Sequence, residues 1–289
     1  MLNIKKNIFL IMIMLLSSIN LIGQKSKVMS FNIRYDNKWD KENSWDLRKD
    51  NIIKLINNYE PSILGTQEGL FNQVSYIDSS LSDYKYIGIG REDGVAAGEY
   101  CAIFYKTTKY KIISHSTFWL SETPDLISVG WDAALERICT YGLFEDLKTK
   151  KRIYIFNAHF DHQGKLAQKQ SAKLILKKIK EINTKNLPIV LMGDLNVTPE
   201  ESPIEIIEDQ LSDALKISEK PLYGPTGTFN GFKNEACIKR IDYAFTKKIK
   251  ILSYSHIDDR LNNNKQISDH YPVLMTMELL NENTVDSLK

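Results

Sequence analysis

Short apolar runs alternate with helical patterns along this chain from residue 28 to about Leu280, and no long low-complexity linker separates them. The segments expected to be strands are residues 28–33, 62–68, 101–105, 112–117, 189–192, 241–245, 249–255 and 272–277. Residues 140–147 and 152–159 indicate a hairpin turned at residues 148–151. The helices are expected at residues 44–58, 70–81 and 165–183. Many strands with a few interspersed helices predict an α/β fold of the α+β kind, built in layers as one domain.

The composition agrees with one globular domain that has a sizeable core. The chain has 289 residues, of which 43% are hydrophobic and 26% are charged. A fold with many strands can reach roughly 250 residues as a single unit. The three cysteines, Cys101, Cys139 and Cys237, are odd in number and form no CxxC pair. This excludes a disulfide scaffold and a cysteine-based zinc module.

Residues 1–23 have the pattern of a secretory signal peptide. Lys5 and Lys6 precede an unbroken apolar run over residues 8–16, and small and polar residues follow at 17–23. The apolar run is shorter than the roughly 20 residues that a membrane span requires. Gln24 stands where a lipoprotein would carry its lipidated cysteine. We therefore expect cleavage near Gly23, a mature domain over residues 24–289 without a transmembrane span, and a secreted or periplasmic location.

The mature chain is formally neutral. The whole chain has 38 Lys and Arg against 36 Asp and Glu, and residues 1–23 contain two lysines and no acid, which leaves 36 against 36. Proteins dedicated to duplex DNA carry basic patches that neutralise phosphates. Neutrality therefore favours a small or single-stranded substrate.

Polar side chains that can do chemistry stand where the predicted strands end. They are Asn32, Glu68, His159, Asp194, Asn196, Asp242, Asp269 and His270. One such residue is more often a turn residue than a catalyst, but a set with complementary chemistry indicates a site. The two-residue spacing of Asp194 and Asn196, and of His159 and Asp161, puts each pair on one face of an extended segment.

This set of side chains suits phosphoryl chemistry. Glu68 offers the hard carboxylate oxygens that Mg²⁺ prefers. Asp194 could orient or deprotonate an attacking water, and His159 and His270 could donate hydrogen bonds to developing negative charge. Asp242 could fix the tautomer of His270.

Six short motifs of the chain resemble those of the endonuclease/exonuclease/phosphatase superfamily, and they occur in the same order. They are Ser-Phe-Asn-Ile-Arg, Gln-Glu-Gly, Asn-Ala-His-Phe-Asp-His, Gly-Asp-Leu-Asn, Arg-Ile-Asp-Tyr and Ser-Asp-His-Tyr-Pro, and the match runs from about Lys27 to Leu280. The resemblance implies a four-layer sandwich of two packed mixed β-sheets flanked by helices. It also implies a phosphoesterase that uses Mg²⁺, with Mn²⁺ as a substitute, and in-line attack of water without a covalent intermediate.

The resemblance also implies roles for individual residues. Glu68 is implied to be the main metal ligand. Asn32 is implied to lie beside Glu68, and Asp269 to face the metal region. The residues that act on the phosphate are Asp194, which positions the water, His159 and Asn196, which contact the phosphate, and the pair Asp242 and His270.

The middle of the chain resembles a secreted bacterial subgroup of this superfamily. Four of its residues are candidates for substrate binding: Arg91, Arg137, Trp131 and Phe229. The substrates implied are phosphate esters, namely nucleic acid, nucleotide, lipid head group or inositol phosphate, with a phosphodiester favoured and no obligate protein partner expected.

Two other functions compete with this interpretation. The segment from Asn157 to His162 is one residue away from an HxHxDH metal motif, which would make the protein a binuclear zinc hydrolase, although the chain has only five histidines. Alternatively, the protein could be a non-catalytic secreted module that binds a ligand on the same fold. Zinc content and binding that persists in EDTA separate these alternatives from a magnesium-dependent phosphoesterase.

Overall fold

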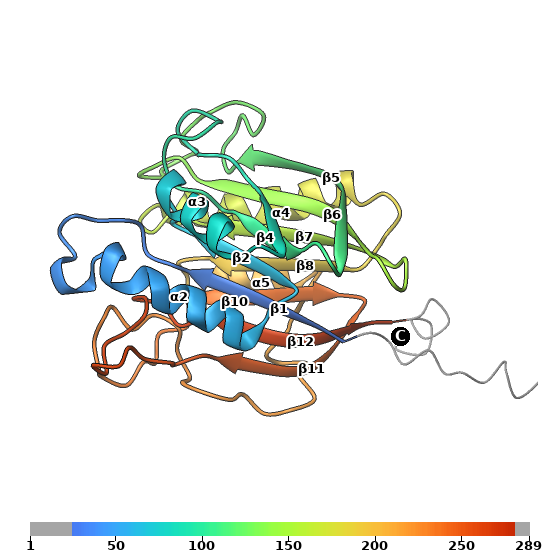
Figure 1. Ribbon diagram of the computed structural model, residues 1–289. Coiled ribbons are helices and arrows are strands. Elements are labelled where there is room, and N and C mark those ends of the chain that lie inside the picture. The colour runs from blue at the N-terminus through green and yellow to red at the C-terminus, as the bar shows by residue number, and fades with distance from the viewer. Residues whose placement is uncertain (1–24, 281–289) are drawn as a thin grey trace, which may run out of the picture.

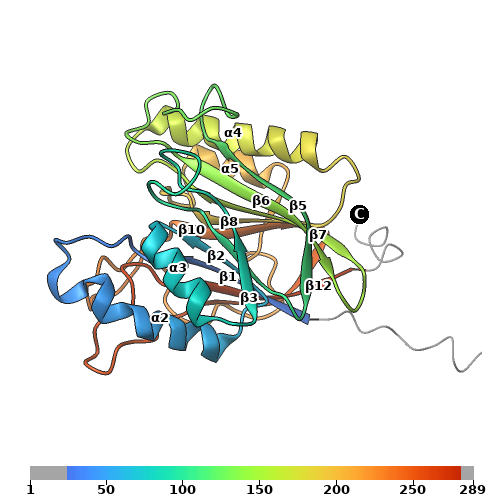
Figure 2. The same cartoon turned by 45° about the horizontal axis from the view of Figure 1, so that its top comes forward.

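Two six-stranded β-sheets pack face to face in the computed structural model, which describes residues 25–280 (Figures 1 and 2). The first sheet has the order β11-β12-β1-β2-β4-β3. Its strands are β1 (Lys25–Asn32), β2 (Ile63–Gln67), β3 (Tyr84–Ile87), β4 (Ile103–Lys106), β11 (Ile249–His256) and β12 (Val273–Leu279). The second sheet has the order β5-β6-β7-β8-β10-β9. Its strands are β5 (Tyr110–Trp119), β6 (Ile138–Asp146), β7 (Arg152–His159), β8 (Ile189–Asp194), β9 (Ser212–Asp213) and β10 (Asp242–Lys247).

Helices cover the outer face of each sheet, which completes the four predicted layers. A 3₁₀ turn η1 (Lys41–Asn43) leads into α2 (Trp45–Tyr59), which packs with α3 (Phe71–Ser80) on the first sheet. The second sheet carries α4 (Lys165–Ile182) and α5 (Ser202–Glu208). Within each sheet one pair of strands is parallel, β1 with β2 and β7 with β8. Both sheets are therefore mixed, as the resemblance implied.

Alternation along the strands builds separate cores on the two faces of each sheet. In β8, Ile189 and Leu191 join the cluster under α4 and α5, whereas Val190 and Met192 join the cluster between the sheets. Successive side chains of a strand point to opposite faces, so a central strand in this sandwich must be apolar on both. This is why residues 189–192 form an uninterrupted apolar run.

The inward-facing row of side chains turns polar where the strands reach one end of the sandwich. In β7 the inward residues Ile153 and Ile155 belong to the core between the sheets, and the same row continues with Asn157 and His159. The register places His159 opposite Asp194 and Asp194 opposite Asp242. The core between the sheets thus leads directly into a polar end.

The structure confirms the predicted strands and helices to within a few residues and adds four short elements. The additions are η1, β3, β9 and α5, which are too short to give a clear periodic pattern in the sequence. The predicted signal peptide over residues 1–23 lies outside the described residues. Between residues 25 and 280, no helix combines the length and the apolar character that crossing a membrane requires.

Candidate active site

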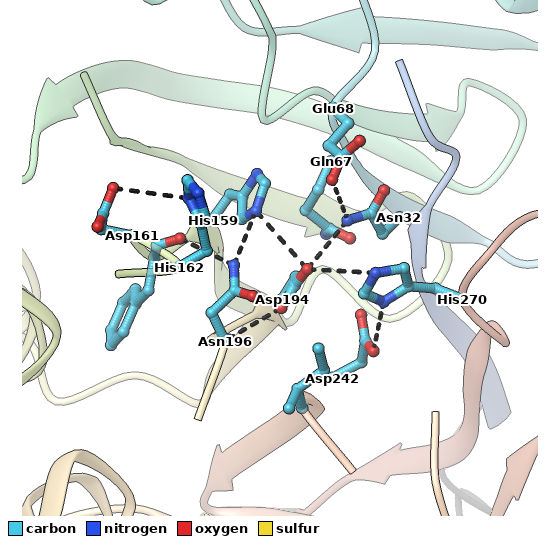
Figure 3. Close-up of polar contacts among 12 residues, drawn as sticks. Asn32, Gln67, Glu68, His159, Asp161, His162, Asp194, Asn196, Asp242 and His270 are labelled. Carbon is cyan, nitrogen blue, oxygen red and sulfur yellow. Dashed lines mark hydrogen bonds and ion pairs between the residues drawn. The ribbon is translucent and has the colours of Figure 1, made fainter. Parts of the chain in front are cut away.

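A cavity of about 460 Å³ opens at the polar end of the sandwich. It is lined by residues from both sheets and from the loops between their strands. Those that the sequence predicted are Glu68, Arg137, His159, Asp194, Asn196, Phe229, Asp269 and His270. Residues more than 230 positions apart in the chain therefore meet in one place, as Figure 3 shows for most of them.

Asp194 lies at the centre of this arrangement. Its Oδ2 accepts a hydrogen bond from Asn32 Nδ2 at 3.0 Å, and its Oδ1 accepts one from the backbone N–H of Asn196 at 2.9 Å. Nε2 of His270 and Nε2 of His159 lie 3.7 Å and 3.6 Å from Oδ2 (Figure 3). Burial, followed by the charge of Asp242, raises the pKa of Asp194 above its usual range.

His270 is held as a charged imidazolium. Its Nδ1 donates to Asp242 Oδ2 at 2.8 Å. Burial alone would lower the pKa of His270, but the charges of Asp242 and Asp194 outweigh it and raise that pKa well above the usual value. The predicted pairing of Asp242 with His270 is therefore present in the structure.

His159 lies on the other side of Asp194 and has a different neighbour. Arg137 Nη1 is 3.2 Å from both ring nitrogens of His159. If Nη1 lay in the ring plane at this distance from Nδ1 and Nε2, it would collide with a ring carbon. The guanidinium of Arg137 therefore lies over the face of the His159 ring. Burial and the Arg137 charge lower the pKa of His159 to about 3. The neutral ring can then accept a hydrogen bond at Nε2 from Asn196 Nδ2, 3.1 Å away.

Glu99 completes this side of the site, and sequence reasoning gave it no role. Its Oε2 lies 3.6 Å from His159 Nδ1 and 2.6 Å from Arg91 Nη1. Because Asn196 donates to Nε2, the neutral ring carries its proton on Nδ1, which faces Glu99. Glu99 lies in the loop between β3 and β4 and follows no predicted strand.

The metal region is the end of the cavity around Glu68. Glu68 Oε1 accepts from Asn32 Nδ2 at 3.0 Å, and Oε2 accepts from the backbone N–H of Tyr35 at 3.1 Å. Arg34 Nη1 lies 3.9 Å from both Glu68 and Asp269. Asn32 Oδ1 accepts the backbone N–H of Arg34, while its Nδ2 donates to Glu68 and Asp194. Its amide therefore supports these two carboxylates and does not point an oxygen at a metal. Burial raises the pKa of Asp269 to about 6.

Two of the four predicted substrate-binding residues do not line this cavity. Arg91 is buried against Glu99 and lines a smaller neighbouring space. Trp131 is half-buried in the loop between β5 and β6. Arg137 and Phe229 do line it, and the Phe229 ring packs edge-on against His270 with centroids 5.0 Å apart.

Two expectations about paired side chains need correction. β7 ends at His159, so Asp161 does not share its face and instead accepts the backbone N–H groups of Gln163 and Gly164. β8 ends at Asp194, and Asn196 reaches the cavity through a left-handed turn with φ 53°. Both expectations assumed that the backbone stays extended as far as Asp161 and Asn196. The strands end two residues before these positions.

A family comparison identifies this arrangement. The model of the Endonuclease/Exonuclease/phosphatase family matches residues 29–270, which include every predicted catalytic and metal-region residue. The chain belongs to the endonuclease/exonuclease/phosphatase family. It is an enzyme of the class that hydrolyses phosphate esters.

Similar proteins support the family membership along the whole domain. A Bacteroides thetaiotaomicron protein of this family is 36% identical, with a TM-score of 0.87, over 90% of this chain and 96% of its own. A mannosyl-6-phosphatase from the same organism is 36% identical, with a TM-score of 0.84, over 87% and 99%. Uncharacterized protein L388 of Acanthamoeba polyphaga mimivirus is 26% identical over 87% of this chain and all of its own length.

Asn157, which would have to be the first ligand of a binuclear zinc site, is not available to a metal in this structure. Asn157 Nδ2 donates to the backbone carbonyls of Thr66 and Ala102, and its Oδ1 accepts from Gln67. Gly65 leaves room for this amide, because a Cβ there would come within 2.9 Å of it. Asn157 therefore ties the two sheets together and is not free to bind a metal.

Proposed function

We propose that the protein is an exported, Mg²⁺-dependent phosphoesterase in which a water activated at Asp194 attacks the phosphorus atom in line with the leaving oxygen. The observation that carries the proposal is the position of Asp194, which lies within 3.7 Å of His159 and His270 beside the Glu68 carboxylate. A buried carboxylate beside the charged donor His270 suits a reaction in which water is deprotonated while negative charge develops on phosphate oxygens.

Each side chain then has a separate task. The raised pKa of Asp194 makes it a better proton acceptor than an exposed carboxylate. The His270 imidazolium lines the cavity and can donate to a phosphate oxygen. Asn196 also lines the cavity, and its amide donates to His159 Nε2 and to the Phe160 carbonyl, so it fixes the His159 ring. Asp242 holds the charge and orientation of His270 through the 2.8 Å hydrogen bond.

The residues present fit a magnesium ion. Mg²⁺ is usually held by one or two carboxylates together with waters and substrate oxygens, and the Glu68 and Asp269 carboxylates both line the cavity. Two groups of side chains have metal-like spacing: Glu68 with His159 and Asp194, and Asp194 with Asp242 and His270. In the second group His270 Nδ1 already donates to Asp242, so the first group, which contains Glu68, is the better candidate. When bound, the metal would neutralise charge on the phosphate and act as a Lewis acid.

Hydrolysis by purified residues 24–289 tests the proposal directly. We expect turnover of phosphate esters with Mg²⁺, none with EDTA, and a loss of at least about 1,000-fold in kcat for Asp194→Asn, because the proton acceptor is removed. Asp146→Asn is the matched control, since Asp146 is equally buried but caps the hairpin turn between β6 and β7. Turnover that persists in EDTA or in Asp194→Asn would contradict the mechanism.

The same assay separates the remaining alternatives. Tight ligand binding in EDTA without turnover under any condition would favour a binding module. Bound zinc after purification, with Asn157→Ala more damaging than Glu68→Ala, would favour a zinc hydrolase.

Export rests on the sequence pattern of residues 1–23. Cell fractionation followed by amino-terminal sequencing should find a mature chain that starts near Gln24 outside the cytoplasm. A cytoplasmic protein that retains Met1 would contradict export without affecting the proposed chemistry.

A further inference from the structure

Arg137 carries a buried charge without a close carboxylate partner. Its Nε lies 3.4 Å from Asp161 Oδ2, and no shorter ion pair of Arg137 exists among residues 25–280. Two other buried arginines, Arg91 and Arg240, each have a carboxylate oxygen within 2.7 Å. Arg48 has no ion pair among the described residues, but backbone carbonyls surround it and it does not line the main cavity. Of the four buried arginines that the structure describes, Arg137 is therefore the one that lines the cavity, and its carboxylate contact is long.

The carboxylate beside Arg137 is already committed to backbone amides. Asp161 Oδ1 accepts the N–H groups of Gln163 and Gly164, and Oδ2 accepts the N–H of Ala134 as well as the long contact from Arg137. A carboxylate shared among four donors neutralises each of them only partly. Asp161 therefore positions Arg137 but leaves most of its positive charge available.

Arg137 borders the space where the substrate phosphate must lie. It lines the main cavity together with His159, Asn196 and His162. Its Nη1 lies over the His159 ring, and Nη2 is 2.9 Å from His162 Nδ1. Because His159 is itself 3.6 Å from Asp194, the guanidinium stands one side chain away from the reacting centre.

We propose that Arg137 makes this site selective for phosphate monoesters over diesters. A monoester carries three terminal oxygens and, above a pKa near 6, two negative charges, whereas a diester carries two terminal oxygens and one charge. A fixed guanidinium beside the phosphate stabilises the additional charge through a charge-assisted hydrogen bond. In the reaction, water adds its oxygen to phosphorus, the ester P–O bond breaks, and one water proton ends on the leaving alcohol, which yields inorganic phosphate.

This inference rests on the proposed phosphoesterase function and narrows its substrate class. The sequence favoured a phosphodiester. Its motifs do not show whether the charge of Arg137 is paired. A protein that is 36% identical to this chain is named a mannosyl-6-phosphatase, and that name is compatible with the selectivity argued from Arg137.

Two substrates with one leaving group provide the test. 4-Nitrophenyl phosphate and methyl 4-nitrophenyl phosphate differ by one methyl group and one charge, and both would be assayed with Mg²⁺ at pH 8. In Arg137→Met the ratio of kcat/KM for the monoester to that for the diester should fall about 10- to 100-fold, the range for one hydrogen bond to a charged group. Arg137→Lys, which keeps the charge, should lose less. Arg91→Met is the control, because Arg91 is as buried but does not line the cavity, so it should change both substrates by the same factor.

A binding measurement keeps the test independent of turnover and of the variant's folding. Calorimetry on the Mg²⁺-loaded wild type should show methyl phosphate binding at least about tenfold more tightly than dimethyl phosphate. Equal affinities, or a kinetic ratio unchanged in Arg137→Met, would overturn the selectivity and leave Arg137 as a support for the His159 ring. Selective binding without any hydrolysis would instead contradict the proposed function.

Discussion

Two buried histidines flank Asp194 at nearly the same distance, and their surroundings give them different charge states. His270 faces a carboxylate, Asp242, and is held protonated. His159 lies beneath a guanidinium, Arg137, and is held neutral. Residue type and distance to the reacting carboxylate are the same, so the difference comes entirely from the next neighbour. On one side of Asp194 the site thus has a charged donor, the His270 ring. On the other side it has the neutral His159 ring, which can donate at one nitrogen and accept at the other.

Removing the carboxylate from the charged side should have the largest effect. Asp242→Asn keeps the shape but removes the largest of the charges that raise the pKa of His270, so that pKa should fall. We expect kcat to fall about 100- to 1,000-fold. Steady-state kinetics, with NMR of the His270 ring nitrogens, would check this result. A variant whose His270 stays protonated at pH 7 would show that Asp242 does not set the charge.

Removing the carboxylate from the neutral side should cost less. Glu99→Gln keeps an oxygen that can accept the Nδ1 proton of His159 but removes the charge 3.6 Å away. Because His159 is neutral with or without that charge, we expect a loss of about tenfold, the size of one hydrogen bond. The comparison of the two histidines would fail if Glu99→Gln lowered kcat as much as Asp242→Asn does.

The polar ends of the strands were predictable from the sequence because each interrupts an apolar run. Asp194 follows a run buried on both faces, and Glu68 follows another, so their position at one edge follows from strand geometry. The charge states were not predictable, since they depend on residues from other loops. Glu99 and Arg137 lie outside the clear strand patterns, and only the folded chain brings them to His159.

The pKa of His159 itself offers a sharper test of the comparison. Arg137→Met removes one of the causes that lower this pKa, while burial and the charge of Arg91 remain. The pKa should therefore rise from about 3 but stay below the usual value of about 6.5 for histidine. A pH titration of the ring by NMR measures it, and the His270 ring should stay protonated throughout as the internal control. An unchanged His159 pKa would mean that burial and the charge of Arg91 keep the ring neutral without Arg137.

A third buried histidine gives the smallest expected effect, on stability. Burial lowers the pKa of His256 to about 4, and its Nδ1 donates to the Pro225 carbonyl. The unfolded chain binds a proton at this residue near pH 6.5, and the folded chain does so only near pH 4, so His256 destabilises the fold as the pH drops through that window. Replacing it by Asn, which can still donate, should reduce the fall in Tm between pH 7 and pH 4.5 by roughly 3–6 °C. Thermal unfolding in EDTA at both pH values would measure the difference, and an identical fall in both proteins would contradict it.

The backbone at the site has a consequence for protein engineering. Glu68 and Asn196 hold φ angles of 65° and 53°, a left-handed conformation that costs a side chain on the order of 1 kcal/mol and glycine almost nothing. Glycine at either position would relax the backbone. Glu68→Gly would also remove a carboxylate of the metal region, and Asn196→Gly would remove the amide that donates to His159. A screen of variants for heat resistance alone would therefore enrich inactive proteins, and directed evolution of this scaffold needs turnover in every round of selection.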